Sequence, residues 1–429
     1  MKNKISAISE KLFPSLMDFC KKIIQTPSLS GQEASVAKLI SEEMQKLGYD
    51  EVFTDEWGNV IGIVKGSEAG PTIMYNGHMD TVPIGDLSSW GEYDPYGAEI
   101  DQSVMQNPLT GNDEKAEVIH GRGSGDLKCN LASQIYAGAI LIELRRQGIN
   151  FAGNFLLTAV VLEENGEIKL CEETLPNNKI DVDAMVCCEP SSLRIMLGHR
   201  GRMEIRVTIS GRSCHGSSPW LGINAVEKSA KFIVAVQNMF ENKTLEDPFL
   251  GKSGIALTMY HCEPNELCIV PDKCTIIYDR RLIPGETTES AIAEIQQVIN
   301  TLAKDDPDFD ATVEINKNQR TTYTGKSDVI ESSKEVWIID QSHPFVKACA
   351  DSLAELNEPV IFSHWSFSTD TPQLGTRMHK PVIGYGPGQE YLIHTPNEKV
   401  RLDFIKRSLP AYALMYLNAS RLPADAFEA

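Results

Sequence analysis

One apolar run, TAVVLEEN (residues 158–165), ends in two adjacent carboxylates, Glu163 and Glu164. The run predicts a buried strand that surfaces at its carboxyl end, where open α/β sheets place their chemistry. Neighbouring residues on an extended chain point to opposite sides, so one acid could hold a metal while the other accepts a proton. A solvated acidic turn is the commoner role of such a pair, so other stretches must decide.

Histidine, aspartate and glutamate residues, which commonly bind metals, also follow other predicted strands. PTIMYNGHMD delivers His78 and Asp80 on one face of a strand, which suits a histidine ligand whose ring is oriented by a carboxylate. DAMVCCEP ends in Glu189, and a later strand leads into GYGPGQEYLIHTPNE, which contains His394 and then Glu398. A single HxD pair is weak evidence for a metal site. The prediction is stronger because possible ligands recur at the ends of several predicted strands.

Two predicted loops contain further candidate functional residues. GRGSGDLKCN places Asp126 in a glycine-rich turn just before a helical stripe, where an N-cap is the alternative role. It follows a Gly- and Pro-rich stretch, residues 82–121, which predicts a long loop with a short hairpin. GRSCHGSSPWLGINA places His215 on a second glycine-rich loop, where an ordinary surface histidine is the alternative.

A chain of 429 residues exceeds one ordinary core, so two domains are expected. Residues 199–316, which we call the lid, have a βαββαβ order of elements, typical of a ferredoxin-like α+β domain. The predicted fold is α/β: a metal-binding catalytic domain, with a mixed sheet flanked by helices, formed by residues 1–198 and 317–429, with the lid inserted between them. An edge strand of the lid is an available pairing surface.

The composition restricts partners and compartment. A net charge of −19 and a pI near 5.0 argue against nucleic acid or an anionic membrane as partners. No uninterrupted apolar run could span a bilayer, and the N-terminal stretch lacks a signal-peptide core, which also disfavours a two-domain solute-binding protein. The ten scattered cysteines suggest reduced thiols in a cytoplasmic protein.

Together the candidates form a donor set of two imidazoles and three carboxylates without a thiolate. Its members are His78, Asp126, Glu164, Glu189 and His394. Such a set suits two divalent ions, zinc above all, or cobalt or manganese. Five ligands can serve two ions if one carboxylate bridges, and Asp126 is the candidate because it belongs to neither histidine motif. Glu163 is then left free to act as a base.

The motifs, taken in order, resemble those of the co-catalytic zinc aminoacylases and exopeptidases, which include acetylornithine deacetylase, succinyl-diaminopimelate desuccinylase and the glutamate carboxypeptidases. They extend over about residues 76 to 400: NGHMDTVP, GRGSGDLK, VVLEENGE, CCEPS, GRSCHGSSPWLGINA, DRRLIPGE and GPGQEYLIHTPNE. By position, the resemblance implies one metal held by His78, Asp126 and Glu189 and another held by Asp126, Glu164 and His394. It also implies that Asp80 orients His78 and that Glu163 is the general base.

The resemblance further implies that the lid dimerises, that His215 polarises the scissile carbonyl and that Arg281 meets a substrate carboxylate. The chain departs from the family pattern at two positions. Cys129 stands where the family usually has glycine after GRGxxDxK, and Cys268 stands where it tends to have asparagine three residues before the lid proline. Asn265 is a nearby substitute for that asparagine. The donor set is complete, so these departures bear on substrate.

The implied function is hydrolysis of the amide bond of an N-acyl amino acid or small peptide with a free carboxylate. Two metals would share and activate a water, and Glu163 would accept its proton. One alternative is a hydrolase of ureido or carbamoyl compounds, distinguished by the amides it turns over. Another is a non-catalytic relative that only binds ligand, which the presence of Glu163 and of the whole donor set disfavours.

Overall fold

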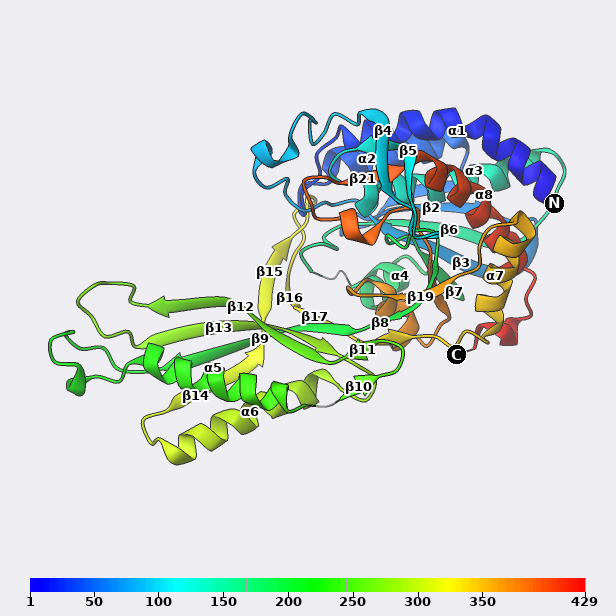
Figure 1. The fold of residues 1–429 in the computed structure, drawn as a ribbon. Coiled ribbons are helices and arrows are strands. Elements are labelled where there is room, and N and C mark those ends of the chain that lie inside the picture. The colour runs from blue at the N-terminus through cyan, green and yellow to red at the C-terminus, as the bar shows by residue number, and fades with distance from the viewer. Residues whose placement is uncertain (167–168, 244, 429) are drawn as a thin grey trace.

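The computed structural model describes residues 1–166, 169–243 and 245–428. The chain forms a larger α/β body built on a nine-stranded sheet, and the lid extends from one side of it (Figure 1). Among the residues described, no helix has the length and apolarity that crossing a membrane requires.

The central strands of the large sheet are parallel. Its spatial order is β1 (Glu51–Thr54), β2 (Val60–Lys65), β6 (Ala152–Val160), β3 (Glu68–His78), β7 (Ala184–Cys187), β20 (Val382–Gly384), β8 (Ile195–His199) and β18 (Trp337–Ile338), with β19 (Phe362–Trp365) beside β8. Strands β6, β3, β7 and β20 run in one direction, whereas β2 and β8 run against them. The carboxyl ends of the four parallel strands therefore meet at one edge.

Helices cover this sheet. They are α1 (Lys2–Ile24), α2 (Ala34–Leu47), α3 (Cys129–Arg146), α4 (Leu175–Asn177), α7 (Pro344–Leu356) and α8 (Leu402–Ala419). Helices α1, α2, α3 and α8 lie on one side of the sheet (Figure 1), and α3 contacts the other three. Nearly every residue of α3 is buried, so α3 is covered on all sides rather than along the single stripe that the sequence predicts. The reason is that α3 lies between the sheet and the helices α1 and α8.

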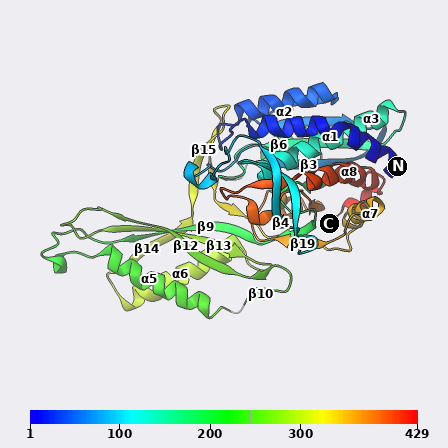
Figure 2. The same ribbon diagram turned by 45° about the horizontal axis from the view of Figure 1, so that its top comes forward.

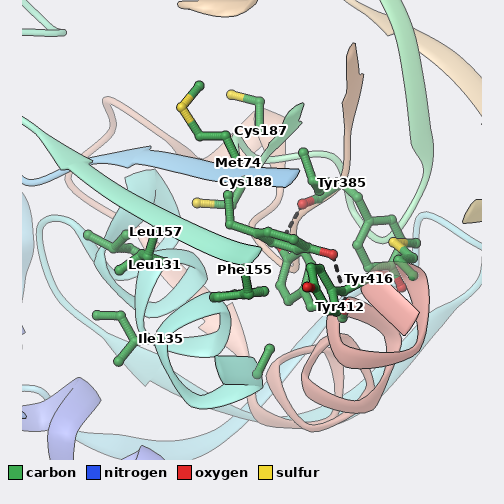
Figure 3. Close-up of a cluster of buried hydrophobic side chains, with 14 of the residues drawn as sticks. Met74, Leu131, Ile135, Phe155, Leu157, Cys187, Cys188, Tyr385, Tyr412 and Tyr416 are labelled. Atoms are coloured by element: carbon green, nitrogen blue, oxygen red, sulfur yellow. Dashed lines mark hydrogen bonds between the residues drawn. The ribbon is translucent and has the colours of Figure 1, made fainter. Parts of the chain in front are cut away.

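An aromatic cluster joins α8 to the central strands (Figure 3). Tyr75 of β3 stacks on Phe155 of β6 with ring centroids 4.4 Å apart and meets Tyr412 of α8 edge-on at 5.9 Å. The Tyr75 hydroxyl donates to the carbonyl oxygen of Tyr412 at 2.9 Å, so its polar end is satisfied inside the core. These contacts hold β3, whose last residue is His78, against a rigid helix layer.

The lid has the ferredoxin-like arrangement that its element order predicts. Its elements are β9 (Gly201–Ser210), α5 (Ala225–Glu241), β10 (Glu246–Asp247), β11 (Gly251–Lys252), β12 (Gly254–Glu263), β13 (Lys273–Leu282), α6 (Thr288–Asp305) and β14 (Asp310–Ile315). The antiparallel sheet has the order β12-β13-β9-β14. Burial alternates along β9, and its inward side chains pack with Phe232 and Val236 of α5.

Short strands complete the molecule. The loop expected over residues 82–121 contains the hairpin β4 (Ile100–Gln106) and β5 (Asp113–His120), and β21 (Lys399–Arg401) pairs with β5. A second hairpin consists of β15 (Lys317–Thr321) and β16 (Ser327–Glu331). Where the chain returns to the large body, β17 (Ser333–Lys334) pairs with the start of β9.

Candidate metal centre

Parallel neighbours bring the predicted donors to one edge of the sheet. β3 ends at His78, β6 ends shortly before Glu163 and Glu164, and β7 ends shortly before Glu189. Because β6, β3 and β7 are adjacent and parallel, the residues that follow them converge. His394 arrives from the loop that follows β20, the next strand of the same set.

The two glutamates do not lie on the strand, contrary to the prediction for residues 158–165. β6 ends at Val160, and Leu162 adopts a φ of 61°, so the chain turns before Glu163. The carboxylate of Asp80 stabilises this turn by accepting the N–H of Glu163 at 3.2 Å and that of Glu164 at 3.1 Å. A turn held by these bonds, rather than strand alternation, directs the two side chains to different neighbours.

Asp126 lies between the imidazoles of His78 and His394. Its Oδ1 is 3.0 Å from Nε2 of His78, and its Oδ2 is 3.1 Å from Nε2 of His394. His394 Nε2 is also 3.0 Å from Glu164, and His78 Nε2 is 3.8 Å from Glu189. α3 begins only at Cys129 with Lys128 at its N-cap position, so the N-cap interpretation of Asp126 is wrong. The carboxylate instead has one oxygen toward each side of the centre, as a bridging ligand requires.

Burial and neighbouring charges shift the pKa values of the proposed metal ligands. Burial opposes ionisation of Asp126, but hydrogen bonds from His394 and His78 hold its pKa well below the usual value. Burial and the charge of Asp126 raise the pKa of Glu164 to about 7, and burial raises that of Glu189. Hydrogen bonds to Asp126 and Glu164 raise the pKa of His394 to about 10. Divalent cations fit this donor set, because they would replace the imidazole protons as partners of the carboxylates.

Asp80 contacts Nδ1 of His78, the ring nitrogen that is not directed toward Asp126. The Nδ1 of His78 is 2.9 Å from the backbone oxygen of Asp80 and 3.5 Å from its carboxylate. The carboxylate also accepts the hydroxyl of Ser30 at 2.7 Å. A partner at Nδ1 directs Nε2 of His78 toward Asp126, and the nearer partner is the Asp80 carbonyl rather than the predicted carboxylate.

Glu163 has a partner that the sequence did not indicate. The ammonium of Lys334, from β17, forms an ion pair with Glu163 and lies 3.5 Å from Asp370. Burial raises the pKa of Glu163, while the positive charge of Lys334 opposes that rise. Lys334 lies between Ser333 and Glu335 and belongs to no recognisable motif. Its position next to Glu163 follows from the pairing of β17 with β9, which the sequence does not predict.

A cleft of about 1210 Å³ opens between this centre and the lid. Arg281 lines it, and its Nε donates to Asp279 at 2.7 Å. Asp279 also accepts Nε of Arg202 at 2.7 Å, so one carboxylate orients both guanidinium groups. The charged side chains of the cleft are Asp126, Glu163, Glu164, Glu189, Arg194, Arg202, Glu204, Arg281, Arg320, Glu331, Lys334 and Glu390, together with His394.

His215 and Asn265 lie elsewhere, and neither is among the described residues that line the cleft. Along the lid sheet, Arg281 pairs with Arg202 near the start of β9, whereas Lys273 pairs with Ser210 at its end. Eight residue steps at about 3.3 Å separate these two ends by about 26 Å. The loops after β9 and between β12 and β13, which carry His215 and Asn265, form the end of the lid far from the large sheet (Figures 1 and 2).

A centre of imidazoles and carboxylates lies at the carboxyl edge of a mixed sheet and faces an inserted α+β lid, an arrangement that fits a metallohydrolase. Residues 74–418 match the model of peptidase family M20/M25/M40. The chain belongs to this family.

Individual proteins agree with this assignment. The chain is 33% identical to YgeY of Escherichia coli (strain K12) over 93% of each chain. It is 24% identical to succinyl-diaminopimelate desuccinylase of Legionella pneumophila (strain Paris), over 73% of this chain and 79% of the relative. The structure of Bacillus subtilis YXEP, described as a dinuclear metal-binding peptidase of family M20, matches with a TM-score of 0.66 at 16% identity, covering 96% of this chain and 99% of that one.

The predicted family and class are thereby confirmed. The chain is a metal-dependent hydrolase that acts on amide bonds, and its fold is that of the M20 peptidases. The family includes enzymes that remove acyl groups as well as peptidases.

Proposed function

We propose that the protein hydrolyses the amide bond of an N-acyl amino acid or small peptide that carries a free carboxylate. The observation that supports this most directly is the presence of Arg281 in the same cleft as the donor set. Arg281 keeps part of its guanidinium edge free of Asp279, which contacts only Nε and Nη2. A guanidinium of this kind recognises a carboxylate through paired hydrogen bonds.

In this proposal His78, Asp126 and Glu189 would hold one divalent cation, and Asp126, Glu164 and His394 would hold a second. When bound, the two ions would supply the electrophilic chemistry of the site by making a water more acidic and by offering positive charge to the oxyanion. The metal is zinc, with cobalt or manganese as substitutes. Glu163 accepts the proton of the water and delivers it to the leaving amine. Burial supports that role because it raises the proton affinity of the Glu163 carboxylate. Lys334 holds the same carboxylate in place.

A second copy of the chain completes the site. Arg281 and His215 lie at opposite ends of one lid sheet, so a single chain does not bring both to one cleft. Pairing of two lids along the edge strand β12 would direct the far end of each lid toward the other cleft. The exposed apolar side chains of β12 favour such pairing, with Leu257, Met259 and Tyr260 at 39%, 57% and 40% exposure. His215 then polarises the scissile carbonyl, and Asn265 lies beside it.

A substrate panel tests this function. Purified protein loaded with Zn²⁺, Co²⁺ or Mn²⁺ is assayed against N-acyl amino acids, di- and tripeptides, and N-carbamoyl amino acids. We expect turnover of an acyl amino acid or a peptide with a free carboxylate. Turnover confined to carbamoyl compounds would replace this substrate class with the ureido alternative, and no turnover of any amide would contradict the proposal.

The matched variant is Arg281→Met, assayed on a substrate and on its carboxylate methyl ester. We expect KM for the free carboxylate to rise about 10- to 100-fold, because a charged hydrogen-bonding partner is lost. KM for the ester should change little. An equal loss on both substrates would show that Arg281 does not recognise the carboxylate.

A further inference from the structure

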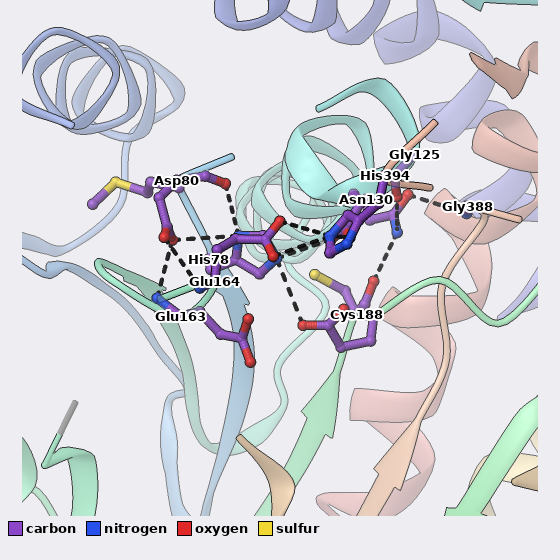
Figure 4. Close-up of polar contacts among 12 residues, drawn as sticks. His78, Asp80, Gly125, Asn130, Glu163, Glu164, Cys188, Gly388 and His394 are labelled. Atoms are coloured by element: carbon purple, nitrogen blue, oxygen red, sulfur yellow. Dashed lines mark hydrogen bonds and ion pairs between the residues drawn. The ribbon is translucent and has the colours of Figure 1, made fainter. Parts of the chain in front are cut away.

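Asn130 occupies an unusual position beneath the metal centre. It lies in the first turn of α3 and is fully buried. Its Nδ2 donates to the carbonyl oxygens of Gly125 at 3.0 Å and Cys188 at 2.8 Å, and its Oδ1 accepts the N–H of Gly388 at 3.1 Å (Figure 4). Both amide hydrogens and the amide oxygen therefore have backbone partners, which come from three segments far apart in the sequence.

Two of these partners belong to the peptide groups that lead into proposed ligands. The carbonyl of Gly125 is in the same peptide group as the N–H of Asp126, and the carbonyl of Cys188 is in that of Glu189. Gly388 lies in the loop after β20 that continues to His394. One planar amide thus joins the backbone of both carboxylate-bearing segments, and its rigid geometry determines how far apart they lie.

The backbone segments around this amide lie too close together for a side chain at Gly386 or Gly388. A Cβ on Gly388 would lie 2.3 Å from the carbonyl oxygen of Gly125 and 3.0 Å from Nδ2 of Asn130. A Cβ on Gly386 would lie 2.5 Å from the carbonyl oxygens of Cys188 and Glu189. The three segments are therefore in direct backbone contact, and only glycine allows the approach.

We propose that Asn130 is a positioning residue for the cation held by His78, Asp126 and Glu189. The inference rests on the ligand set of the proposed function and adds a residue that touches neither metal nor substrate. By bonding the peptide groups before Asp126 and Glu189, Asn130 keeps their carboxylates at the separation that one ion requires. Such supporting groups alter metal affinity by about 10- to 100-fold when they are removed.

The test compares Asn130→Asp and Asn130→Ala with wild type in titrations of metal-free protein with Co²⁺, followed by absorption spectroscopy. Aspartate keeps the shape but would place an oxygen against two carbonyl oxygens, and alanine removes all three bonds. We expect both variants to bind one ion normally and the other about 10- to 100-fold more weakly. The spectrum with one ion bound should match that of Glu189→Gln and differ from that of Glu164→Gln.

Gln134 provides the control. It is fully buried in the same helix and donates to the carbonyl oxygen of Val186 in β7 at 3.0 Å, but that peptide group does not adjoin a ligand. Gln134→Met should lower the unfolding temperature of metal-free protein while both ions bind as in wild type. The inference fails if the Asn130 variants bind both ions as wild type does, or if Gln134→Met weakens the same ion equally.

These results separate the inference from the proposed function. If wild type binds two ions and the Asn130 variants behave like wild type, only the role of Asn130 is wrong. If wild type binds fewer than two ions after zinc addition, the ligand set itself is wrong. If Asn130→Asp does not fold, Asn130→Ser, which keeps one donor, should show an intermediate loss of affinity for the same ion, and unchanged affinity would overturn the inference.

Discussion

Glu163 and Glu164 are adjacent in the chain, yet their carboxylates have different neighbours. Glu163 pairs with Lys334, whereas Glu164 lies 3.0 Å from His394. Both backbone N–H groups donate to Asp80, so the turn is fixed before either side chain acts. At the scale of single residues, these different neighbours are the basis for proposing Glu163 as the proton acceptor and Glu164 as a metal ligand.

Glu163→Gln and Glu164→Gln should therefore have different effects. Glu163→Gln keeps the shape but removes the base, so we expect both ions to stay bound while kcat falls by about 10²- to 10⁴-fold. Glu164→Gln should weaken one ion, and added metal should restore part of the activity. Metal analysis and kinetics on both variants decide the assignment, which is reversed if Glu163→Gln loses an ion and Glu164→Gln retains two.

Glu33 predicts a pH dependence of stability. Its Oε1 accepts the N–H groups of Gly31 at 2.9 Å and Leu162 at 3.2 Å, and in the described part of the chain Oε2 has no hydrogen-bond partner. Burial and the nearby charge of Asp80 raise the pKa of Glu33 from 4.5 to about 7. Between these two values the folded state holds a proton that the unfolded state has lost, so the free energy of unfolding falls as pH rises through this window.

Glu33→Gln should remove this loss, because glutamine can accept the same two N–H groups without charge. We expect the variant to be more stable than wild type at pH 8 by on the order of 1–3 kcal/mol, with a smaller difference at pH 5. Urea denaturation of metal-free protein at both pH values measures the effect. The same difference at pH 5 and pH 8 would show that Glu33 does not titrate in this window.

At the scale of elements, the loop after β20 and the turn before α3 are joined by a buried ion pair. Oε1 of Glu398 accepts the N–H groups of Gly125 at 3.0 Å and Asp126 at 3.1 Å. Its Oε2 lies 2.5 Å from Nη1 of Arg122, and both side chains are buried. Glu398 was noted in the sequence as following His394, but its connection to Asp126 appears only in the fold.

Removing one member of this pair should destabilise the protein more than removing both. Glu398→Gln or Arg122→Met leaves a buried charge uncompensated, which typically costs about 3–5 kcal/mol. The double variant should recover part of that loss, because no unpaired charge remains. A double-mutant cycle in urea measures the coupling, and a double variant that loses the sum of the single losses would exclude it.

At the scale of the whole molecule, the proposed site needs two chains. Glu163 lies in the cleft of one chain, while His215 lies at the far end of that chain's lid. In the proposed dimer, the cleft of one chain would contain its own Arg281 and the His215 of the partner subunit. The separation of Arg281 from His215 within one chain is the reason for proposing this assembly.

Mixing two inactive variants tests this assembly. In a dimer of His215→Ala with Glu163→Gln, the His215→Ala chain keeps its base and receives His215 from its partner. Random reassortment should then restore about a quarter of the wild-type active sites. The control adds Met259→Lys on β12 to both variants, which should prevent recovery by disrupting the lid pairing. Absence of recovery from dimers shown to contain both chains would place His215 outside the partner's cleft.

The sequence determined the local features of this protein. Apolar periodicity is a local property, so it predicted the strands that lead to His78 and Glu189. The order of the elements was enough to predict the ferredoxin-like lid, because few topologies are compatible with a βαββαβ order. The motif series was enough to predict the family.

The tertiary structure decided what depends on distant segments meeting. Asp126 proved to be the residue between two imidazoles rather than a helix cap, because β3 and the loop after β20 reach the same edge. Lys334 and Asn130 have no local signal, since each acquires its role from partners far away in the chain. The turn at Leu162 likewise forms because Asp80, from another strand, accepts the N–H groups that follow it. The hydrophobic pattern of a helix or strand predicts which of its sides is buried. The functional site depends instead on which helices, strands and loops lie next to one another in the fold.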